Sequence, residues 1–237
     1  MNTLVIGGSG GIGAGLVEVI NESRQFGRVV ATHHQSPGRQ YAGVSWLELD
    51  LASQQSVTSA ADTLLSSLSA IDLFICAAGY LHGDKGSPEK SLKAARPELL
   101  MHSYLVNACG PLLMFQQCMP LIKSAKKPIV IFLSAQVGSI EDNHSGGWYS
   151  YRMSKAALNM GVRNLGLECA RFKNQPIVVA VHPGTTTTKL SEPFVKHRKA
   201  IPMLASESAK AILALVKNLK PADTGKFLKT DGQQLPW

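Results

Sequence analysis

Residues 1–13, with the sequence MNTLVIGGSGGIG, decide the fold of this chain. The short apolar run at residues 2–6 contains β-branched side chains and predicts a buried strand. The glycines that follow predict a turn, and apolar residues at helical spacing predict a helix from Ala14 to Glu22. A strand, a glycine turn and a helix start in this order make an anion site, because backbone N–H groups and the helix dipole both favour a phosphate.

The glycine spacing is Gly7-xxx-Gly11-x-Gly13, and Gly8, Gly10 and Gly13 offer a second register that the sequence leaves open. Glycine suits a pyrophosphate because a side chain would keep the backbone away from it. The alternative interpretation is a flexible glycine-rich turn without a ligand.

Further apolar runs alternate with helical stretches along the chain. The six longer runs are residues 2–6, 28–33, 44–49, 71–77, 128–134 and 177–182, and a short run follows at Phe227–Leu228. This alternation predicts an α/β fold: a single Rossmann-type, doubly wound parallel sheet of about seven strands flanked by helices. Since no linker or repeat interrupts it, we expect one domain over residues 1–237. Ligands of such sheets bind at the C-terminal ends of the strands.

Composition narrows the class of protein. Hydrophobic residues make up 45% and charged residues 17%, which is typical of a folded soluble domain. No uninterrupted apolar run approaches the ~20 residues of a membrane span, and we expect no signal peptide. The four cysteines have no metal-ligand spacing, so we expect buried free thiols, no metal and a cytoplasmic location.

The net charge of +8 is compatible with nucleic acid, an anionic membrane or an acidic substrate as a partner. The densest basic cluster is residues 196–199, and no aromatic side chains lie between its charges. A solvated loop explains this cluster better than a nucleic-acid interface does. We therefore expect neither nucleic acid nor a membrane among the partners, and a role in attracting an anionic cofactor stays open.

Residues 151–155, YRMSK, carry the clearest chemical signal. Tyr151 and Lys155 are four residues apart in a segment that continues as a helix, so their side chains are expected on one helical face. A phenol titrates near ~10, and a nearby cation lowers that pKa by favouring the phenolate. The pair is therefore a candidate proton-transfer device. The alternative is a surface helix along which the lysine stem lies.

Together, these motifs resemble those of the short-chain dehydrogenase/reductase family, over essentially the whole chain. The resemblance implies hydride transfer between a nicotinamide and a carbonyl or alcohol, with the proton handled by Tyr151, Lys155 and Asn107. It also implies cofactor contacts at Gly7, Ser9, Gly10, Gly11, Ile12, Gly13, Asp50, Leu51, Ala77, Ala78, Gly79, Tyr151, Lys155, Pro183, Gly184, Thr186 and Thr188. The chain departs from the family where Cys76 and Ala77 replace two asparagines.

A narrower resemblance links residues 138–143, 146–152 and 235–237 to the C-factor/sniffer-like branch. That branch implies carbonyl reductase chemistry on a small-molecule substrate, or a signalling role in which turnover is incidental. Family members are commonly homodimers or homotetramers. The apolar helices expected within residues 98–118 and 153–170 could serve either as core or as such an interface.

Relatives hold the carbonyl oxygen with a hydroxyl that follows the fifth strand. Alignment of this segment on its glycine places Ala135 at that position, next to Ser134. We choose Ser134 as the catalytic hydroxyl because it stands at the predicted strand end. The alternatives are that Ser134 only bonds backbone, and that the oxygen is held by Ser139, by Gln136 or by Tyr151 alone.

The second strand ends without a carboxylate. NAD-preferring sites place an acid there to bond the ribose 2′-hydroxyl, and an acid would repel a 2′-phosphate. Here the strand ends in His33 and His34, with Arg39 shortly after, and we assign His33 to the cofactor site. The pattern favours NADP(H) over NAD(H), although the glycine turn carries no arginine and solvated histidines would tolerate both cofactors. The stretch from Thr185 to Pro202 is the expected lid over the substrate.

Overall fold

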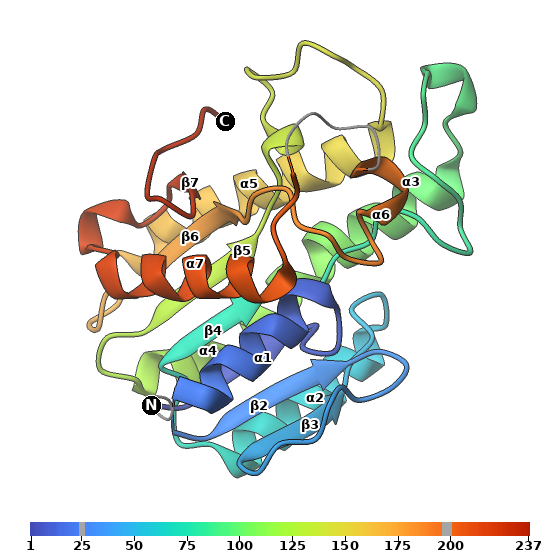
Figure 1. Cartoon of the computed structure of the whole chain (residues 1–237). Helices are drawn as coiled ribbons and strands as arrows, with labels where there is room; N and C mark the ends of the chain where they lie inside the picture. Colours follow the sequence, from blue (N-terminus) through green and yellow to red (C-terminus); the bar gives the residue numbers. More distant parts are fainter. Residues whose placement is uncertain (24–26, 196–200) are drawn as a thin grey trace.

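The computed structural model describes residues 1–23, 27–195 and 201–237. Its centre is one sheet of seven strands, and every neighbouring pair is parallel (Figure 1). The strands are β1 (Thr3–Ile6), β2 (Val29–His33), β3 (Val44–Glu48), β4 (Leu73–Cys76), β5 (Ile129–Leu133), β6 (Ile177–His182) and β7 (Phe227–Lys229). Their order is β3-β2-β1-β4-β5-β6-β7, so the chain order reverses beside β1, which is where such sheets bind ligands. The predicted Rossmann-type sheet of about seven strands is confirmed.

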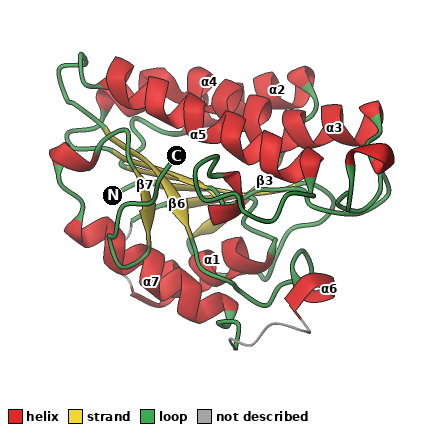
Figure 2. Cartoon of the chain, turned by 90° about the horizontal axis from the view of Figure 1, so that it is seen from above, coloured by secondary structure: helices red, strands yellow, loops and turns green. Residues whose placement is uncertain are grey.

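Helices cover both faces of the sheet (Figure 2). One layer contains α1 (Gly11–Ser23) and α7 (Ala205–Asn218), and the other contains α2 (Gln54–Ser67), α4 (Gly110–Ser124) and α5 (Tyr149–Cys169). The remaining helical segments are α3 (Pro97–Tyr104), α6 (Glu192–Val195), the π-helical η2 (Leu105–Cys109), and the 3-10 turns η1 (Leu92–Ala94), η3 (Gln136–Gly138) and η4 (Pro221–Asp223).

Each face of the sheet packs its own apolar core. Beneath α2, α4 and α5, the rings of Phe74, Phe115 and Phe132 pack against one another at centroid distances of 5.6, 5.7 and 6.1 Å. Leu16 and Ile212 belong to the core beneath α1 and α7. Because the central strands are buried on both faces, they read as continuous apolar runs, which is why the sequence pattern locates them.

The helical stretch Pro97–Ser124 is long and apolar enough to cross a membrane by length and composition alone, with a mean hydropathy of 1.3 in its most apolar window. Polar residues such as His102 and Asn107 interrupt it, which is why no uninterrupted apolar run marks it in the sequence. Half of that window is buried, and its helices pack against α2 and α5. A core helix passes the same test, so this is weak evidence for a membrane span.

Candidate active site

The turn between β1 and α1 brings backbone N–H groups to the C-terminal edge of the sheet. Gly7 has a φ of 75°, its N–H donates to the Thr32 hydroxyl at 3.0 Å, and the Gly10 N–H donates to the Gly7 carbonyl at 3.1 Å. A Cβ on Gly13 would overlap the Gly7 carbonyl, so the turn requires glycine there. Helix α1 starts at Gly11, earlier than predicted, because the last glycines of the turn already form its first turn. Such an open helix N-terminus suits a phosphate.

Two other segments lie against this turn. A Cβ on Gly7 would be 2.8 Å from Ala78 Cα, and a Cβ on Gly11 would overlap the Thr188 side chain. The end of β4 and the loop after β6 therefore meet the glycine turn, which brings together most of the residues expected to contact a cofactor. Leu51 differs from them, because it is buried beside the start of α4.

Asn107 lies in η2, a π-helical turn, and is fully buried. Its Oδ1 accepts the Tyr80 N–H at 2.6 Å, and its Nδ2 donates to the Tyr80 carbonyl at 2.8 Å and to the Ser154 hydroxyl at 2.9 Å. These bonds tie the chain after β4 to α5. Single π-turns inside helices are frequent at functional sites, where the wider turn changes the direction of its side chains.

Tyr151 and Lys155 lie one turn apart on α5. Lys155 is 3% exposed, and its Nζ donates to the Leu133 carbonyl at the end of β5 at 2.9 Å. The same Nζ lies 5.8 Å from the centre of the Tyr151 ring. A Cβ on Gly79 would be 3.4 Å from Asn107 Oδ1 and 3.7 Å from Lys155 Nζ. The structure therefore brings the asparagine, the phenol and the lysine together beside the end of β4.

Burial controls the titration of both groups on α5. It raises the pKa of Tyr151 to about 12. It lowers the pKa of Lys155 to about 8, and only the thiolate form of the nearby Cys76 would oppose this effect. The sequence argument predicts a phenol pKa below ~10, and the structure shows the opposite direction. The cost of desolvating the phenolate sets this direction, and the charge of Lys155 does not offset it.

Cys76 occupies a position where family members carry an asparagine, and it is buried. Burial raises the pKa of its thiol to about 11, so the thiol is neutral at pH 7. It therefore brings no negative charge to Lys155 at that pH. Cys118 and Cys169 are also buried, whereas Cys109 is partly exposed, and all four thiols are free as expected.

Ser134, the predicted catalytic hydroxyl, lies directly after β5 and is buried. Its Oγ donates to Asn159 Oδ1 on α5 at 2.6 Å, and its N–H donates to the Val181 carbonyl at 2.8 Å. A hydroxyl has one proton, so in this arrangement Ser134 has none to give to a substrate oxygen. Holding a carbonyl would require the hydroxyl to turn away from Asn159.

The other polar candidates after β5 also have partners. The Ser139 hydroxyl donates to the backbone oxygen of Trp237 at 3.1 Å. Gln136 Nε2 donates to Asp142 Oδ2 at 2.7 Å, which leaves its second N–H for another acceptor. At the position where relatives carry the hydroxyl, Ala135 offers the neighbouring cavity only a methyl group.

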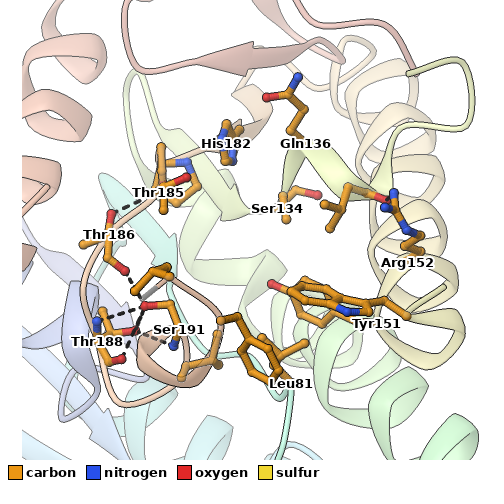
Figure 3. A pocket seen from close by; sticks show the side chains of 18 of the residues that line it. Leu81, Ser134, Gln136, Tyr151, Arg152, His182, Thr185, Thr186, Thr188 and Ser191 are labelled. Carbon is orange, nitrogen blue, oxygen red and sulfur yellow. Dashed lines mark hydrogen bonds between the residues drawn. The ribbon is translucent and has the colours of Figure 1, made fainter. Parts of the chain in front are cut away.

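A cavity of about 410 Å³ opens beside Tyr151 (Figure 3). Tyr151 and Arg152 face the loop at residues 185–191 across it, while Ser134 and His182 reach it from strand ends. The Tyr151 hydroxyl points into the cavity, and no described residue takes a hydrogen bond from it. Apolar side chains supply much of the remaining lining: Ile12, Leu81, Val137, Trp148, Leu190, Phe194 and Val195. This lining suits an organic substrate with a polar group near the phenol.

The predicted lid contacts the opposite wall through aromatic rings. Phe194 of α6 packs against the Trp148 ring at a centroid distance of 5.0 Å and against the His82 ring at 5.4 Å. His82 Nε2 also lies 3.2 and 3.1 Å from two backbone carbonyl oxygens of the lid. Residues 185–195 of the lid thus border the cavity, whereas the basic cluster at residues 196–199 lies outside the described residues.

The end of β2 carries the groups expected to bind the adenosine half of a cofactor. His33 Nδ1 is buried and has no hydrogen-bond partner among the described residues. His34 Nε2 lies 3.8 Å from Asp50 Oδ2, and Arg39 Nη1 lies 3.9 Å from Glu18 Oε1, with all four side chains well exposed. Two carboxylates therefore lie near the His34 imidazole and the Arg39 guanidinium, and the sequence of β2 alone does not reveal them.

Two supports of the site carry no sequence signal that we recognised. Tyr80 holds Asn107 through its backbone, across 27 positions. The buried carboxylate of Glu89 accepts two hydrogen bonds from Ser150 at the start of α5, across 61 positions. Contacts between residues so far apart in the sequence cannot be predicted from residue type or spacing, because only the completed fold brings the residues together.

Comparison with known proteins assigns the family. The family model for short chain dehydrogenases matches residues 1–199. The chain is 32% identical over 190 residues to the 1-hydroxy-2-glutathionyl-2-methyl-3-butene dehydrogenase of Rhodococcus sp. (strain AD45). The aligned part covers 80% of this chain and 78% of that protein. It is 29% identical over 252 residues to an uncharacterized oxidoreductase of Schizosaccharomyces pombe, covering 98% of this chain and 96% of the relative. The chain therefore belongs to the short-chain dehydrogenase/reductase family, and it is an oxidoreductase.

Two further likenesses concern the narrower branch. A carbonyl reductase from chicken fatty liver, solved with NADPH bound, matches with a TM-score of 0.88 at 26% identity, over 100% of this chain and 94% of that chain. The C-signal of Myxococcus xanthus is 30% identical over 138 residues, or 58% of this chain and 78% of that protein. These are the two kinds of protein that the narrower sequence resemblance implies.

Proposed function

We propose that the protein catalyses reversible hydride transfer between a nicotinamide cofactor and a carbonyl or alcohol substrate. The observation that carries this proposal is the convergence of Tyr151, Lys155 and Asn107 beside a cavity at the C-terminal edge of the sheet, next to the glycine turn. When bound, the cofactor supplies the hydride, while the protein orients the reactants and polarises the carbonyl. We place this activity in one domain that spans the chain.

In this proposal, Tyr151 gives its proton to the developing alkoxide. A pKa of about 12 keeps the phenol protonated at neutral pH, so the proton is available for carbonyl reduction. Lys155 would hold the ribose hydroxyls of the nicotinamide half and return a proton to the phenol. Asn107 would anchor the water that continues this relay, and its bonds to Tyr80 and Ser154 hold it in place.

The residues present fit a dinucleotide. Most positions of the glycine turn carry no side chain, so its backbone can approach two phosphates closely. At the adenosine end, the described part of β2 ends without a carboxylate, and His33 Nδ1 lacks a partner among the described residues. An imidazole that can donate there supports NADP(H) over NAD(H), as does the NADPH held by the chicken reductase. The carboxylates beside His34 and Arg39 limit the expected preference.

Two arrangements could hold the substrate oxygen. In the first, the Ser134 hydroxyl leaves Asn159 and donates to the oxygen together with Tyr151. In the second, Ser134 stays on Asn159 and Tyr151 donates alone, which predicts modest turnover. The 2.6 Å bond from Ser134 to Asn159 supports the second arrangement.

Titration of the purified protein with NADPH and with NADH, followed by fluorescence, tests the cofactor. Binding of NADPH at least about tenfold tighter, equivalent to ~1.4 kcal/mol, supports the 2′-phosphate argument. Equal or tighter binding of NADH contradicts it, and binding of neither cofactor contradicts the oxidoreductase mechanism.

Turnover is then tested with two carbonyl probes, 4-nitrobenzaldehyde and 9,10-phenanthrenequinone, by the loss of NADPH absorbance. Tyr151→Phe removes the proton donor and keeps the ring that packs against Trp148. We expect it to lower kcat by about 10²- to 10⁴-fold while the NADPH affinity stays within about twofold. A Tyr151→Phe protein with wild-type turnover would contradict the assignment.

A second candidate function is a cofactor-binding signalling or regulatory protein in which turnover is incidental. The methyl group of Ala135 and the engaged hydroxyl of Ser134 favour it, as does the likeness to the C-signal. A loss-of-function phenotype rescued equally by the wild type and by Tyr151→Phe would support this function and count against the reductase.

For its partners, we propose a small-molecule carbonyl or alcohol and a second copy of the chain. Helices α3 and α5 pack together and expose Met101, Tyr104, Met153 and Met160, an apolar set that a homodimer or homotetramer could cover. We propose a cytoplasmic location and no nucleic-acid partner. Salt-sensitive binding to DNA would contradict the latter.

A further inference from the structure

We propose that Glu89 is a positioning residue for the catalytic helix: its buried carboxylate, supplied by a distant loop, caps the N-terminus of α5 and holds Tyr151 in the cavity. The inference rests on the proposed function, in which Tyr151 is the proton donor. It goes beyond that function because Glu89 touches neither the cavity nor the reacting groups.

The N-cap residue of helix α5 makes no capping hydrogen bond of its own, and within the helix the Arg152 side chain reaches back to the preceding turn, where its Nε donates to the Gly146 carbonyl at 3.2 Å. This N-cap residue is Trp148, which has a left-handed φ of 52°. Gly146 and Gly147 before it are also left-handed, with φ values of 63° and 64°. Residues with a bulky side chain rarely adopt such a conformation, so the surroundings must impose it.

Glu89 supplies contacts on both sides of this helix start. Its carbonyl accepts the Trp148 N–H at 2.5 Å. Its Oε2 accepts the Ser150 N–H at 3.0 Å and the Ser150 hydroxyl at 2.9 Å. A carboxylate is well suited to this place, because free N–H groups and the helix dipole both favour negative charge at a helix N-terminus.

The position of Glu89 is nevertheless unfavourable for helix stability alone. The residue is 3% exposed, and its second oxygen, Oε1, is buried without a hydrogen-bond partner among the described residues. Burying a charged group that is incompletely bonded is costly. A serine or asparagine at the N-cap position itself would satisfy the same N–H groups without a buried charge. The groups that Glu89 holds in place therefore explain its buried position better than helix capping alone does.

The groups that Glu89 holds belong to the active site. The Trp148 ring lies 6.2 Å from the Tyr151 ring and 5.0 Å from the Phe194 ring of the lid, measured between centroids. Lys155, one turn further along, is held separately by the end of β5. Loss of the cap would therefore shift Tyr151 and the aromatic wall relative to a lysine that stays in place.

Four variants test this inference. Glu89→Ala removes the carboxylate, whereas Glu89→Gln keeps one acceptor oxygen without the charge. Ser150→Ala removes one of the two donors from the helix side, with little risk to folding. Glu98→Gln is the matched control, because it neutralises an exposed glutamate in the first turn of α3.

With 9,10-phenanthrenequinone and NADPH, we expect Glu89→Ala to lower kcat at least tenfold and Glu89→Gln to lower it by a smaller factor. The KM for NADPH should stay within twofold, because the glycine turn is held by other contacts. A protein that only loses stability would not show this split between kcat and KM. Folded Glu89→Gln and Ser150→Ala proteins with wild-type kcat would overturn the inference even where Glu89→Ala fails to fold.

A second readout does not depend on turnover. Incorporation of 3-fluorotyrosine gives each tyrosine a ¹⁹F NMR signal. The signal of Tyr151 is the one missing from the spectrum of Tyr151→Phe. Glu89→Gln and Ser150→Ala should shift this signal, whereas Glu98→Gln should not. A wild type that reduces neither probe would refute the proposed function, and an unshifted Tyr151 signal would separately refute the role of Glu89.

Discussion

Ala135→Ser should restore the hydroxyl that this chain lacks. Ala135 follows the end of β5, borders the cavity, and has an extended backbone with φ −143° and ψ 142°. Successive side chains of an extended segment point to opposite sides. A hydroxyl at position 135 would therefore not be drawn to Asn159, which takes the proton of Ser134. It could donate to the oxygen on which charge develops during reduction.

The size of the gain follows from one added hydrogen bond to a charged oxygen. Such a bond contributes about 1.5–3 kcal/mol, and each ~1.4 kcal/mol is a tenfold change in rate. Because the surrounding residues have not been arranged for it, we expect the lower end, a kcat about tenfold above wild type. Ala135 is partly exposed, so the change in stability should stay within about 0.5 kcal/mol.

The assay is steady-state reduction of 4-nitrobenzaldehyde by NADPH, with Ser134→Ala as the companion variant. Removing that hydroxyl leaves Asn159 Oδ1 without its donor, which should cost about 1–3 kcal/mol of stability with little change in kcat. The reasoning fails in either of two cases: Ala135→Ser leaves kcat unchanged, or Ser134→Ala lowers it about 10²-fold or more, as loss of an oxyanion donor does.

Three further predictions concern stability and assembly. Because the folded pKa of Lys155 is about 8 against 10.5 for a free lysine, this residue binds more protons in the unfolded chain between these values, and its own contribution to stability should rise with pH by up to roughly 3 kcal/mol. Above pH 9 the buried thiols, whose pKa values burial raises, oppose this rise, so the contribution is measured as the difference between wild type and Lys155→Met. Lys155→Met should flatten that rise in urea unfolding, and an unchanged slope would contradict the buried ammonium. Trp237→Ala removes a ring stacked on Phe227 at 5.8 Å and should cost about 2 kcal/mol in thermal unfolding, whereas an unshifted Tm would contradict this packing. Met153→Glu with Met160→Glu should convert an oligomer to monomers in light scattering, and an unchanged mass would exclude this face as the interface.

The fold could be predicted because its signals are local. Buried parallel strands produce apolar runs, and even the three-residue strand β7 shows as Phe227–Leu228. The division of Pro97–Ser124 into α3, η2 and α4 could not be predicted in the same way. One π-turn adds a single residue to a helical repeat, which apolar periodicity does not resolve. That added residue lies in the turn that carries Asn107, so the detail that was missed belongs to the site.

Within the site, the sequence could predict which residues share a helix face but not what each one contacts. The spacing of Tyr151 and Lys155 is enough to predict their proximity. The engagement of Ser134 depends on Asn159, 25 positions away, and the cap on α5 depends on Glu89. Burial is a property of the whole fold as well, which is why the direction of the phenol's pKa shift could not be predicted from the spacing.

That reversed shift has a consequence for proton transfer. A proton moves downhill from the stronger acid to the weaker one, and an alkoxide is a far stronger base than a phenolate. A phenol with a pKa of about 12 keeps its proton at neutral pH and can still give it to an alkoxide. Lys155, with a pKa of about 8, can in turn reprotonate the phenolate. The pKa rises from the lysine to the phenol to the alcohol, so each proton transfer toward the substrate is downhill. In the proposed mechanism, burial would therefore set up a graded relay in the direction of carbonyl reduction, for which a phenol pKa below 10 is not needed.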